Sequence, residues 1–499
     1  MNYVNVINNQ TLPISSIPEL EYSSFLEQNV FHLIKAEGAH CVNYYGFPFE
    51  SKIKLICCIA NDVSASINVS SCVVDTKQIL PCFTNHNLVF EKFEREIHEN
   101  FGIQYADHPW LKPVRFPFNR ANKNIKVTDY PFFQIESEEL HEVGVGPIHA
   151  SIIEPAHFRF ICNGEQILHL EIQMGYQHRG VEQLFLEKKK LLQRTILSES
   201  IAGDSVAGHS VAFVNLWESL CGFKASADLQ LARTIALELE RIAIHTGDLS
   251  GMCTDVGYQL GSAVFGRLRT PVINYFQKWC GNRFAKGLIR AGKSNFPFTK
   301  ELADQLLILF NQYEPDFEHM CKELFGLPTV LARFEKTAVV STEQAATTGA
   351  VGMAARMSGI KRDIRFSHPY DLYPELGHQP VIKHHGDVYS RAQIRKEEIR
   401  QSMGYIRKLI QNYPQPQSTT STLSSPCASS FSISLVEGWR GEICHCAITD
   451  DQGALIHYKI KDPSFHNWLA EALSVRNNEI SDFPICNKSF DLSYSGHDL

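Results

Sequence analysis

The chain has 499 residues, of which 44% are apolar and 20% charged, a composition typical of a soluble globular protein. Its formal charge of −7, with acidic and basic residues interspersed, leaves no basic stripe for nucleic acid. No stretch approaches the roughly 18 apolar residues of a membrane span, and the first residues lack the pattern of a signal peptide. We therefore expect a cytoplasmic protein of at least two domains, attached to a membrane only through partners.

The N-terminal part is predicted to form a small α/β domain over residues 1–120. Its pattern indicates a helix over residues 18–37, strands over 52–60 and 64–74, and a helix over 88–100. Phe90, Phe93 and Ile97 share one face of the last helix, which should end at Gly102. Residues 121–145 are polar and should form a linker to the next domain.

The rest of the chain, residues 146–499, is mainly helical by its periodicity. The strongest helical face is formed by Leu229, Ala232, Ile235, Ala236, Leu239, Ile242 and Ala243. Further helices are expected over residues 181–197, 206–220, 299–324, 342–357 and 388–412. Residues 413–430 are rich in Ser, Thr and Pro and should form a flexible loop. A small antiparallel sheet should follow over 431–436, 442–448 and 454–460, so the fold class is α+β multidomain.

The cysteines and one histidine-rich segment contain residue types that can bind metals, but both are better explained without a metal. None of the fourteen cysteines forms a Cys-x-x-Cys pair, and Cys444 and Cys446 should lie buried on one face of a strand. The segment that contains His378, His384, His385 and Asp387 is expected to be a polar loop in which Asp387 caps the following helix.

The segment Gly175-Tyr-Gln-His-Arg-Gly-Val-Glu182 places His178 and Glu182 four residues apart. Such a pair could relay protons, because His titrates near neutral pH and a carboxylate can orient it. A structural ion pair at the helix start is the alternative, which the spacing alone favours.

This segment resembles a signature shared by the large subunits of nickel–iron hydrogenases and the D subunit of NADH:quinone oxidoreductase (complex I). Other segments agree in order along the chain with the same family: Gly146-Pro-Ile-His149, Glu154-Pro-Ala-His-Phe-Arg159, Leu237–Leu249, Asp255-Val-Gly257, Ala355–Gly359, Arg362-Asp-Ile-Arg365, His368-Pro-Tyr370, Gly386–Arg391 and Asp462-Pro-Ser-Phe465. The resemblance implies a hydrogenase-large-subunit-like domain over residues 146–499.

The first domain has a resemblance of its own. Glu94-Arg-Glu96, Phe101-Gly-Ile103 and His108-Pro109 are similar to the C subunit of complex I. A C-like part fused to a D-like part is the arrangement of membrane-bound hydrogenases of the hydrogenase-4 and formate hydrogenlyase type.

The sequence departs from this family where hydrogenases bind nickel and iron with two Cys-x-x-Cys pairs. The first pair falls on Ala202 and Ser205, and the second on Ser493 and Gly496. Ala and Gly offer no side-chain ligand, and soft metals prefer thiolates. We therefore expect no nickel–iron site.

The quinone site of the complex I relatives implies a His in the N-terminal hairpin and a Tyr near a helix start. His149 or His157 could contact a quinone, whereas Leu197 stands at the Tyr position and Tyr176 lies elsewhere in the motif. Losing the phenol removes a hydrogen bond of about 1 kcal/mol and one source of protons.

The family fold implies a polar cluster around the altered cavity, made of His178, Arg179, Glu182, Asp204, His209, Arg356 and Asp491. This cluster could couple proton and redox changes, or it could be a network kept for packing; both interpretations remain open.

The resemblance as a whole implies a core subunit of an energy-converting oxidoreductase complex, peripheral to the inner membrane. Its partners would be a small subunit with a [4Fe-4S] cluster and integral membrane subunits; the chain itself would bind no cofactor, with quinone as a possible ligand. Two alternatives stay open: a quinone-reducing subunit, and a structural subunit without cavity chemistry. The electron donor and acceptor are not specified by the sequence.

Overall fold

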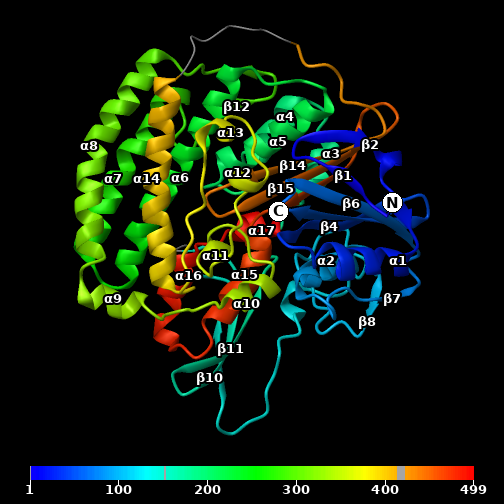
Figure 1. Cartoon of the computed structure of the whole chain (residues 1–499). Helices are drawn as coiled ribbons and strands as arrows, with labels where there is room; N and C mark the ends of the chain where they lie inside the picture. The colour runs from blue at the N-terminus through cyan, green and yellow to red at the C-terminus, as the bar shows by residue number, and fades with distance from the viewer. Residues whose placement is uncertain (1, 151–152, 413–421) are drawn as a thin grey trace.

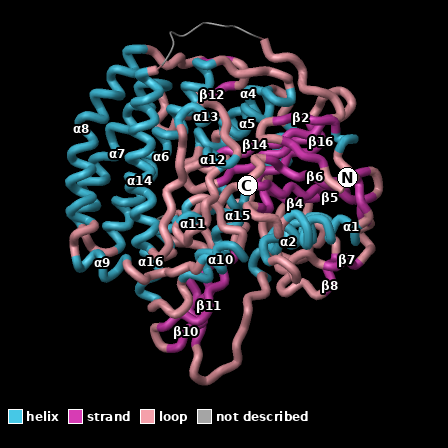
Figure 2. Tube along the Cα trace, in the orientation of Figure 1, coloured by secondary structure: helices cyan, strands magenta, loops and turns pink. Residues whose placement is uncertain are grey.

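The computed structural model describes residues 2–150, 153–412 and 422–499. Figure 1 shows a β-rich part that contains the N-terminus beside a part built from long helices. Figure 2 shows the same division, with strands gathered on one side and helices on the other. The predicted α+β class is confirmed. No helix in the described part of the chain is long and apolar enough to cross a membrane.

The N-terminal sheet has the order β1-β6-β5-β4. The two predicted strands are its central strands, β5 and β6. Its members are β1 (Val4–Val6), β4 (Ala39–Phe49), β5 (Lys52–Asn61) and β6 (Ser66–Val74), with β3 (Glu19–Leu20) parallel to β6. The sequence analysis missed β4, because His40, Asn43, Gly46 and Pro48 interrupt its apolar pattern.

The two helices expected in this part are confirmed with changed bounds. The first is α1 (Tyr22–Leu26), which continues as a π-helical turn over Glu27–Leu33. The second is α2 (Glu91–Phe101), preceded by a 3-10 turn over Leu88–Phe90. It buries Phe93 and Ile97 and ends at Gly102, whose φ of 77° suits a residue without Cβ.

The predicted C-terminal sheet is confirmed and gains one strand from the N-terminus. Strands β14 (Ser430–Glu437), β15 (Glu442–Thr449) and β16 (Leu455–Lys461) pair in an antiparallel sheet. Strand β2 (Gln10–Pro13) adds to β14, so residues about 420 positions apart pair directly. Cys444 and Cys446 share one face of β15, both buried, with their Sγ atoms 3.7 Å apart.

Long helices form the other half of the molecule. They are α5 (Val206–Leu220), α6 (Ala227–Asp255), α7 (Gln259–Cys280), α8 (Lys300–Leu324) and α14 (Val388–Gln411). Helix α6 packs against both α7 and α14, which explains why apolar residues surround it (Figure 1). Helix α7 was not predicted. Asp387 caps α14 as expected, because its side chain accepts a hydrogen bond from the Ser390 backbone N–H.

Two predicted helices are broken in the structure. The one expected over residues 181–197 is α3 (Val181–Glu187) followed by α4 (Leu191–Ser198). The one expected over 342–357 is α10 (Thr342–Thr347) followed by α11 (Met353–Arg356). Gly349 and Gly352 have positive φ between these two, so the backbone turns where the apolar pattern continues.

The segment expected as a linker contains one strand of a third sheet. Strand β9 (His141–Val145) pairs with β10 (His157–Asn163), which pairs with β11 (Gln166–Gln173). This sheet projects from the lower edge of the molecule in Figure 1. Residues 413–421 of the expected flexible loop lie outside the described residues, and 422–429 contain no helix or strand.

The C-terminal segment is helical and returns to the centre of the fold (Figure 1). It comprises α15 (Ser464–Ser474), α16 (Phe483–Phe490) and α17 (Tyr494–Asp498). The remaining short elements are β7 (Ile79–Pro81), β8 (Gln104–Ala106), β12 (Ile289–Arg290), β13 (Lys293–Ser294), α9 (Pro328–Phe334), α12 (Ile364–Ser367) and α13 (Tyr373–Leu376).

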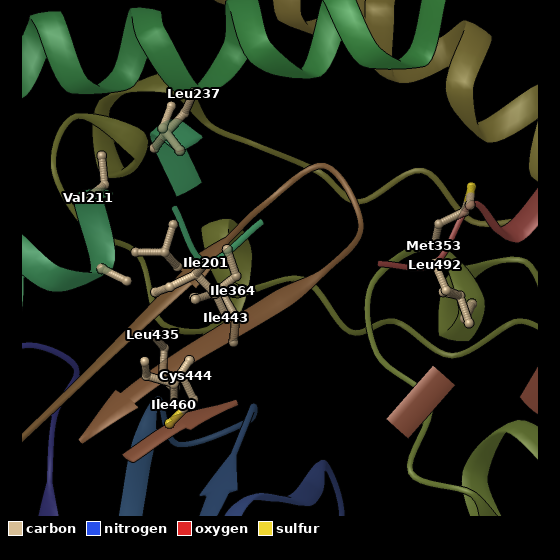
Figure 3. Close-up of a cluster of buried hydrophobic side chains, with 14 of the residues drawn as sticks. Ile201, Val211, Leu237, Met353, Ile364, Leu435, Ile443, Cys444, Ile460 and Leu492 are labelled. Carbon is tan, nitrogen blue, oxygen red and sulfur yellow. The ribbon is translucent and has the colours of Figure 1, made fainter. Parts of the chain in front are cut away.

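One apolar cluster connects the loop before α5 to the helices and the C-terminal sheet. Figure 3 shows Ile201, Val211, Leu237, Leu435 and Ile443 gathered from a loop, two helices and the C-terminal sheet. All five are buried. The loop that carries Ala202 and Ser205 is therefore anchored to the core through the neighbouring Ile201.

Candidate functional site

The four positions at which the family resemblance predicts metal-binding cysteines lie in two segments, and all four residues are buried. Ala202 and Ser205 belong to the turn between α4 and α5, and Ser493 and Gly496 begin α17. The Ser493 hydroxyl caps α17 by accepting a hydrogen bond from the Gly496 N–H at 2.8 Å. Arg179 joins the two segments, because its guanidinium donates to the carbonyls of Ser200, Ile201 and Ser495.

A second arginine, Arg440, lies between the same two segments. Its guanidinium forms a two-pronged ion pair with Asp204, at 2.7 and 2.6 Å. Its Nε donates to the backbone carbonyl of Asp491 at 2.5 Å, and Nη1 lies 3.3 Å from the Ser205 hydroxyl. The Arg440 side chain is 4% exposed. A buried positive charge therefore connects the turn before α5 to the turn before α17.

The turn between β14 and β15 holds Arg440 in place. Gly438 and Gly441 exchange backbone hydrogen bonds across this turn, at 2.9 and 3.1 Å. The Trp439 indole donates to the Asp204 carbonyl, and the Arg440 guanidinium stacks on its ring at 3.9 Å. Gly441 packs directly on Gly352, where a Cβ on either residue would collide with the other backbone. The tip of the β14–β15 hairpin is therefore held by Asp204 on one side and by Gly352 on the other.

A nickel–iron centre does not fit these residues. Ala202 and Gly496 have no ligand atom, and both serine hydroxyls already take part in hydrogen bonds. A Cβ at Gly496 would lie 2.7 Å from Oδ2 of Asp462. That oxygen accepts a hydrogen bond from His209 Nε2 at 3.0 Å, so it cannot move away freely. Within the described residues, no three or more His, Cys, Asp or Glu side chains are arranged to hold a metal ion.

His209 belongs to a fully buried chain of polar groups beside this site. Its Nε2 faces Asp462, and its Nδ1 lies 3.1 Å from Nε2 of His445. His445 Nδ1 in turn lies 2.7 Å from the Tyr458 hydroxyl. Burial and the neighbouring His209 lower the pKa of His445 well below its ordinary value. These four side chains form a continuous series of polar contacts, so a change of protonation at Asp462 can alter the hydrogen bond of Tyr458.

Asp491 is one of two neighbouring carboxylates behind Arg440. Lys488 Nζ lies 2.9 Å from Asp491 and 3.4 Å from Asp248, and Arg395 Nε donates to Asp248 at 2.9 Å. Burial and the charge of Asp491 raise the pKa of Asp248 to about 7. Although burial opposes it, Lys488 and Arg440 hold the pKa of Asp491 below its ordinary value. The pair can store one proton near neutral pH.

Arg356 lies elsewhere, in a deeper charged network. Its guanidinium pairs with Glu437 and Glu398, both at 2.7 Å, and with Asp363 at 3.3 Å. It forms no ion pair with Asp204 or Asp491 among the described contacts. Burial and the charge of Asp363 raise the pKa of Glu437 to about 7. Glu437 ends β14, just before the turn that carries Arg440, so this network meets the site through the backbone of the hairpin.

His178 and Glu182 do not bond to each other in the described structure. The His178 Nδ1 lies 2.7 Å from the Asp498 carbonyl, and Glu182 pairs with Lys459 at 3.1 Å and accepts from the Ile460 N–H. Glu182 thus ties the start of α3 to β16, which agrees with the structural alternative. Both residues, with Arg179, line a cleft of about 580 Å³ between the N-terminal sheet region and α3.

Comparison with known proteins finds similar subunits of hydrogenases and of NADH-quinone oxidoreductases. A family described as respiratory-chain NADH dehydrogenase, 49 kDa subunit, matches residues 255–432. Hydrogenase-4 component G of Escherichia coli is 29% identical over 389 residues, covering 78% of this chain and 67% of the relative. The fused C/D subunit of NADH-quinone oxidoreductase from Phocaeicola vulgatus is 25% identical over 425 residues, covering 78% and 81%. The chain is similar in sequence to these subunits of complex I and of hydrogenases.

The family resemblance predicted from the motifs is thereby confirmed. Formate hydrogenlyase subunit 5 of E. coli, 28% identical over 422 residues, covers 81% of this chain and 74% of its own length. The match to a fused C/D protein covers a similar share of this chain. The departure from a thiolate set at Ala202, Ser205, Ser493 and Gly496 stays a prediction from the motif pattern.

The two histidines predicted for quinone contact lie close to each other in the hairpin region. His149 Nε2 is 2.8 Å from the Ala156 carbonyl, and its ring packs against Phe158. His157 packs against Phe132, and burial lowers its pKa. Residues 151–152 of the intervening loop lie outside the described residues, so quinone contact at His149 or His157 stays a prediction.

The sequence analysis missed the residue at the centre of the site. Arg440 lies in Gly438-Trp-Arg-Gly441, between two buried strands, where a charged residue flanked by glycines in a tight turn is a usable signal. Asp248 and Lys488 were not singled out either, because their partners are about 240 residues away.

Proposed function

We propose that this chain is a core subunit of a membrane-associated, energy-converting oxidoreductase complex related to group 4 hydrogenases and complex I. It couples electron transfer in a partner [4Fe-4S] protein to integral membrane subunits, and it does so without a nickel–iron site. The names of the relatives support the class of complex: hydrogenase-4, formate hydrogenlyase and NADH-quinone oxidoreductase.

The observation that carries this proposal is the ion pair between Arg440 and Asp204. The guanidinium contacts both segments that would carry the metal thiolates, and Asp204 stands within one of them. A charged pair in this position keeps the two segments joined without a metal. The neighbouring Asp248 and Asp491 supply a group that exchanges a proton near neutral pH, which suits coupling of charge movement to protonation.

The decisive experiment is purification of the complex through a tag on this chain. We expect a partner with an iron–sulfur spectrum, integral membrane subunits, and nickel far below one atom per chain. One nickel per chain, together with reduction of an acceptor by hydrogen, would overturn the proposal.

Variants of the purified complex distinguish the alternatives. If quinone is reduced in this chain, His149→Ala or His178→Ala abolishes reduction of a quinone analogue, whereas the exposed His319→Ala does not. If the chain is purely structural, Glu182→Gln and Asp204→Asn leave the activity of the complex intact. Under our proposal Asp204→Asn lowers electron transfer, while the amount of assembled complex shows whether assembly was affected.

A further inference from the structure

A second cleft lies away from the site described above. Its volume is about 410 Å³, and it is bordered by α2, the segment 109–114, β11 and α15. None of the residues predicted from the sequence as site residues lines it. A cleft of this size matches the lower range of small-molecule sites.

The walls of this cleft are apolar and rich in aromatic rings. Trp110, Tyr130, Phe133 and Trp468 supply the rings, and aliphatic side chains of β11 and α15, such as Ile172 and Leu473, supply the rest. Phe133 is 53% exposed, and its ring packs against His169 at the edge of the cleft. A flat ligand would find several ring faces to stack on.

The charged residues of the cleft leave two cations unmatched. Arg95 pairs with Glu91, and Lys112 pairs with Glu171. Lys92 and Arg476 also line the cleft, but neither forms an ion pair with a described carboxylate.

The two unmatched cations differ in depth. Lys92 is partly buried and donates only to the Phe465 carbonyl, at 2.7 Å. Arg476 is exposed at the rim, where its Nη2 lies 3.3 Å from His169 Nδ1. The cleft thus has an amine inside and a guanidinium at its entrance, neither of them paired with a described carboxylate.

Two buried nitrogen atoms of cleft-lining residues also lack partners among the described residues. Trp468 is 2% exposed and its Nε1–H donates to no acceptor; His497 is 1% exposed and its Nε2 is unpaired. An indole N–H can only donate, so it needs an acceptor that this part of the chain does not provide. Leaving such a donor buried and unpaired is unfavourable by about 1–3 kcal/mol.

We propose that this cleft binds an aromatic small molecule that carries an acidic group, such as a carboxylate, phosphate or sulfonate. The acid lies against Lys92, Arg476 attracts it at the rim, and the ring stacks among Trp110, Tyr130 and Trp468. Burial lowers the pKa of the Lys92 amine to about 7, and an anion bound beside it favours the charged form. This site goes beyond the proposed function and does not depend on it.

A matched pair of fluorescent probes tests the proposal on the full-length chain. The anion 8-anilinonaphthalene-1-sulfonate and the neutral N-phenyl-1-naphthylamine share one aromatic body and differ in the sulfonate. We expect the anion to bind roughly tenfold tighter than the neutral probe, because a charge-assisted hydrogen bond in a desolvated site is worth that much. Lys92→Met should remove this advantage and Arg476→Gln should reduce it, while the exposed control Lys77→Met changes neither probe.

A second variant locates the probes. Leu473→Trp should fill the cleft and weaken both probes at least tenfold, whereas Leu260→Trp on the exposed face of α7 should leave both unchanged. Equal affinity for the two probes, or an unchanged anion affinity in Lys92→Met, would overturn the proposal. If Leu473→Trp does not fold, the Lys92→Met titration alone decides.

Discussion

Arg440 connects two segments that lie far apart in the sequence. Its side chain reaches Asp204 on one segment and the Asp491 carbonyl on the other, with 4% of its surface exposed. Asp204 is 35% exposed, so water screens part of the attraction. The arginine is consequently the more sensitive partner, because removing it leaves both the Asp204 carboxylate and the Asp491 carbonyl without this donor.

We predict that Arg440→Gln lowers the free energy of unfolding by about 3 kcal/mol, because the buried donor set is lost. Asp204→Asn should lower it by about 1 kcal/mol, because the screened carboxylate is replaced by an amide that still accepts a hydrogen bond. Chemical denaturation of the full chain measures both. The control is Arg267→Gln, which breaks an ion pair with Asp316 whose side chains are 61% and 50% exposed and should change stability by less than about 0.5 kcal/mol. An effect of Arg440→Gln no larger than that of the control would contradict the bridging role.

The Asp248–Asp491 pair predicts a specific dependence of stability on pH. The pKa of Asp248 is raised to about 7, from about 3.9 in an unfolded chain. Between these values the folded protein binds more protons than the unfolded one, so the contribution of Asp248 to stability is full at low pH and is lost as the pH rises toward 7. Arg395 and Lys488, which face Asp248, favour its charged form but do not outweigh burial and Asp491.

We therefore expect Asp248→Asn to be more stable, relative to the parent chain, at about pH 8 than at about pH 5. The midpoint of urea unfolding, measured for both proteins at both pH values, tests this. Asp304→Asn, an exposed position on α8, should show the same difference from the parent at both pH values. A relative stability of Asp248→Asn that does not change between pH 5 and pH 8 would show that the carboxyl is charged throughout this range.

At the scale of elements, the β14–β15 hairpin depends on close contact with the turn before α11. Gly352 has φ of 61° and ψ of −138°, a conformation that residues with a Cβ avoid. Its backbone packs on Gly441, whose φ is 138°. The backbone turns between α10 and α11, where the sequence pattern predicted one continuous helix. This turn places Gly352 against the hairpin that carries Arg440.

Gly352→Ala should destabilise the protein by more than about 3 kcal/mol, because it combines backbone strain with a collision at Gly441. The matched control is Gly404→Ala, at an exposed position inside α14 with open space around it, which should stabilise by about 0.5–1 kcal/mol. Thermal unfolding of the two variants measures the difference. Equal melting temperatures for the two variants would mean that the Gly352–Gly441 contact is unimportant.

At the scale of the whole molecule, the N-terminal and C-terminal parts share polar and apolar contacts. Strand β2 completes the C-terminal sheet, and His40 on β4 lies 2.6 Å from Glu442 on β15. Glu442 also pairs with Lys461 at 2.5 Å, and its side chain is fully buried. Although burial opposes it, Lys461 and His40 keep the pKa of Glu442 below its ordinary value. The division into an N-terminal domain up to residue 120 and a second domain from residue 146 stays a prediction.

We predict that Glu442→Gln lowers the free energy of unfolding by about 3–5 kcal/mol at neutral pH, because Lys461 and His40 lose their buried anion. The loss should shrink as the pH falls through the acid range, since the parent chain then loses the same interaction by protonation. Differential scanning calorimetry at several pH values measures both effects. Glu335→Gln, at an exposed position after α9, should be neutral; a Glu442→Gln penalty that does not depend on pH in the acid range would contradict the ion-pair explanation.

The sequence by itself determined several of the elements and the family resemblance. The apolar pattern predicted α5, α8, α14 and the C-terminal strands closely, because each element is one continuous run of residues with buried apolar side chains. It failed at β4 and at the two broken helices, where polar residues or glycines interrupt a pattern whose partner surface is distant in sequence. The motif order predicted the family resemblance, which is confirmed. The loss of the metal thiolates stays a prediction from the same motifs.

Only the tertiary structure decided what stands at that site. Arg440 meets Asp204 across 236 residues, and Asp248 meets Lys488 across 240. Pairings at such separations carry no local pattern, since they depend on how the sheet, the helices and the C-terminal segment pack on a common core. For the same reason the sequence did not predict the cleft around Lys92 and Trp468. Its lining residues come from segments in both halves of the chain.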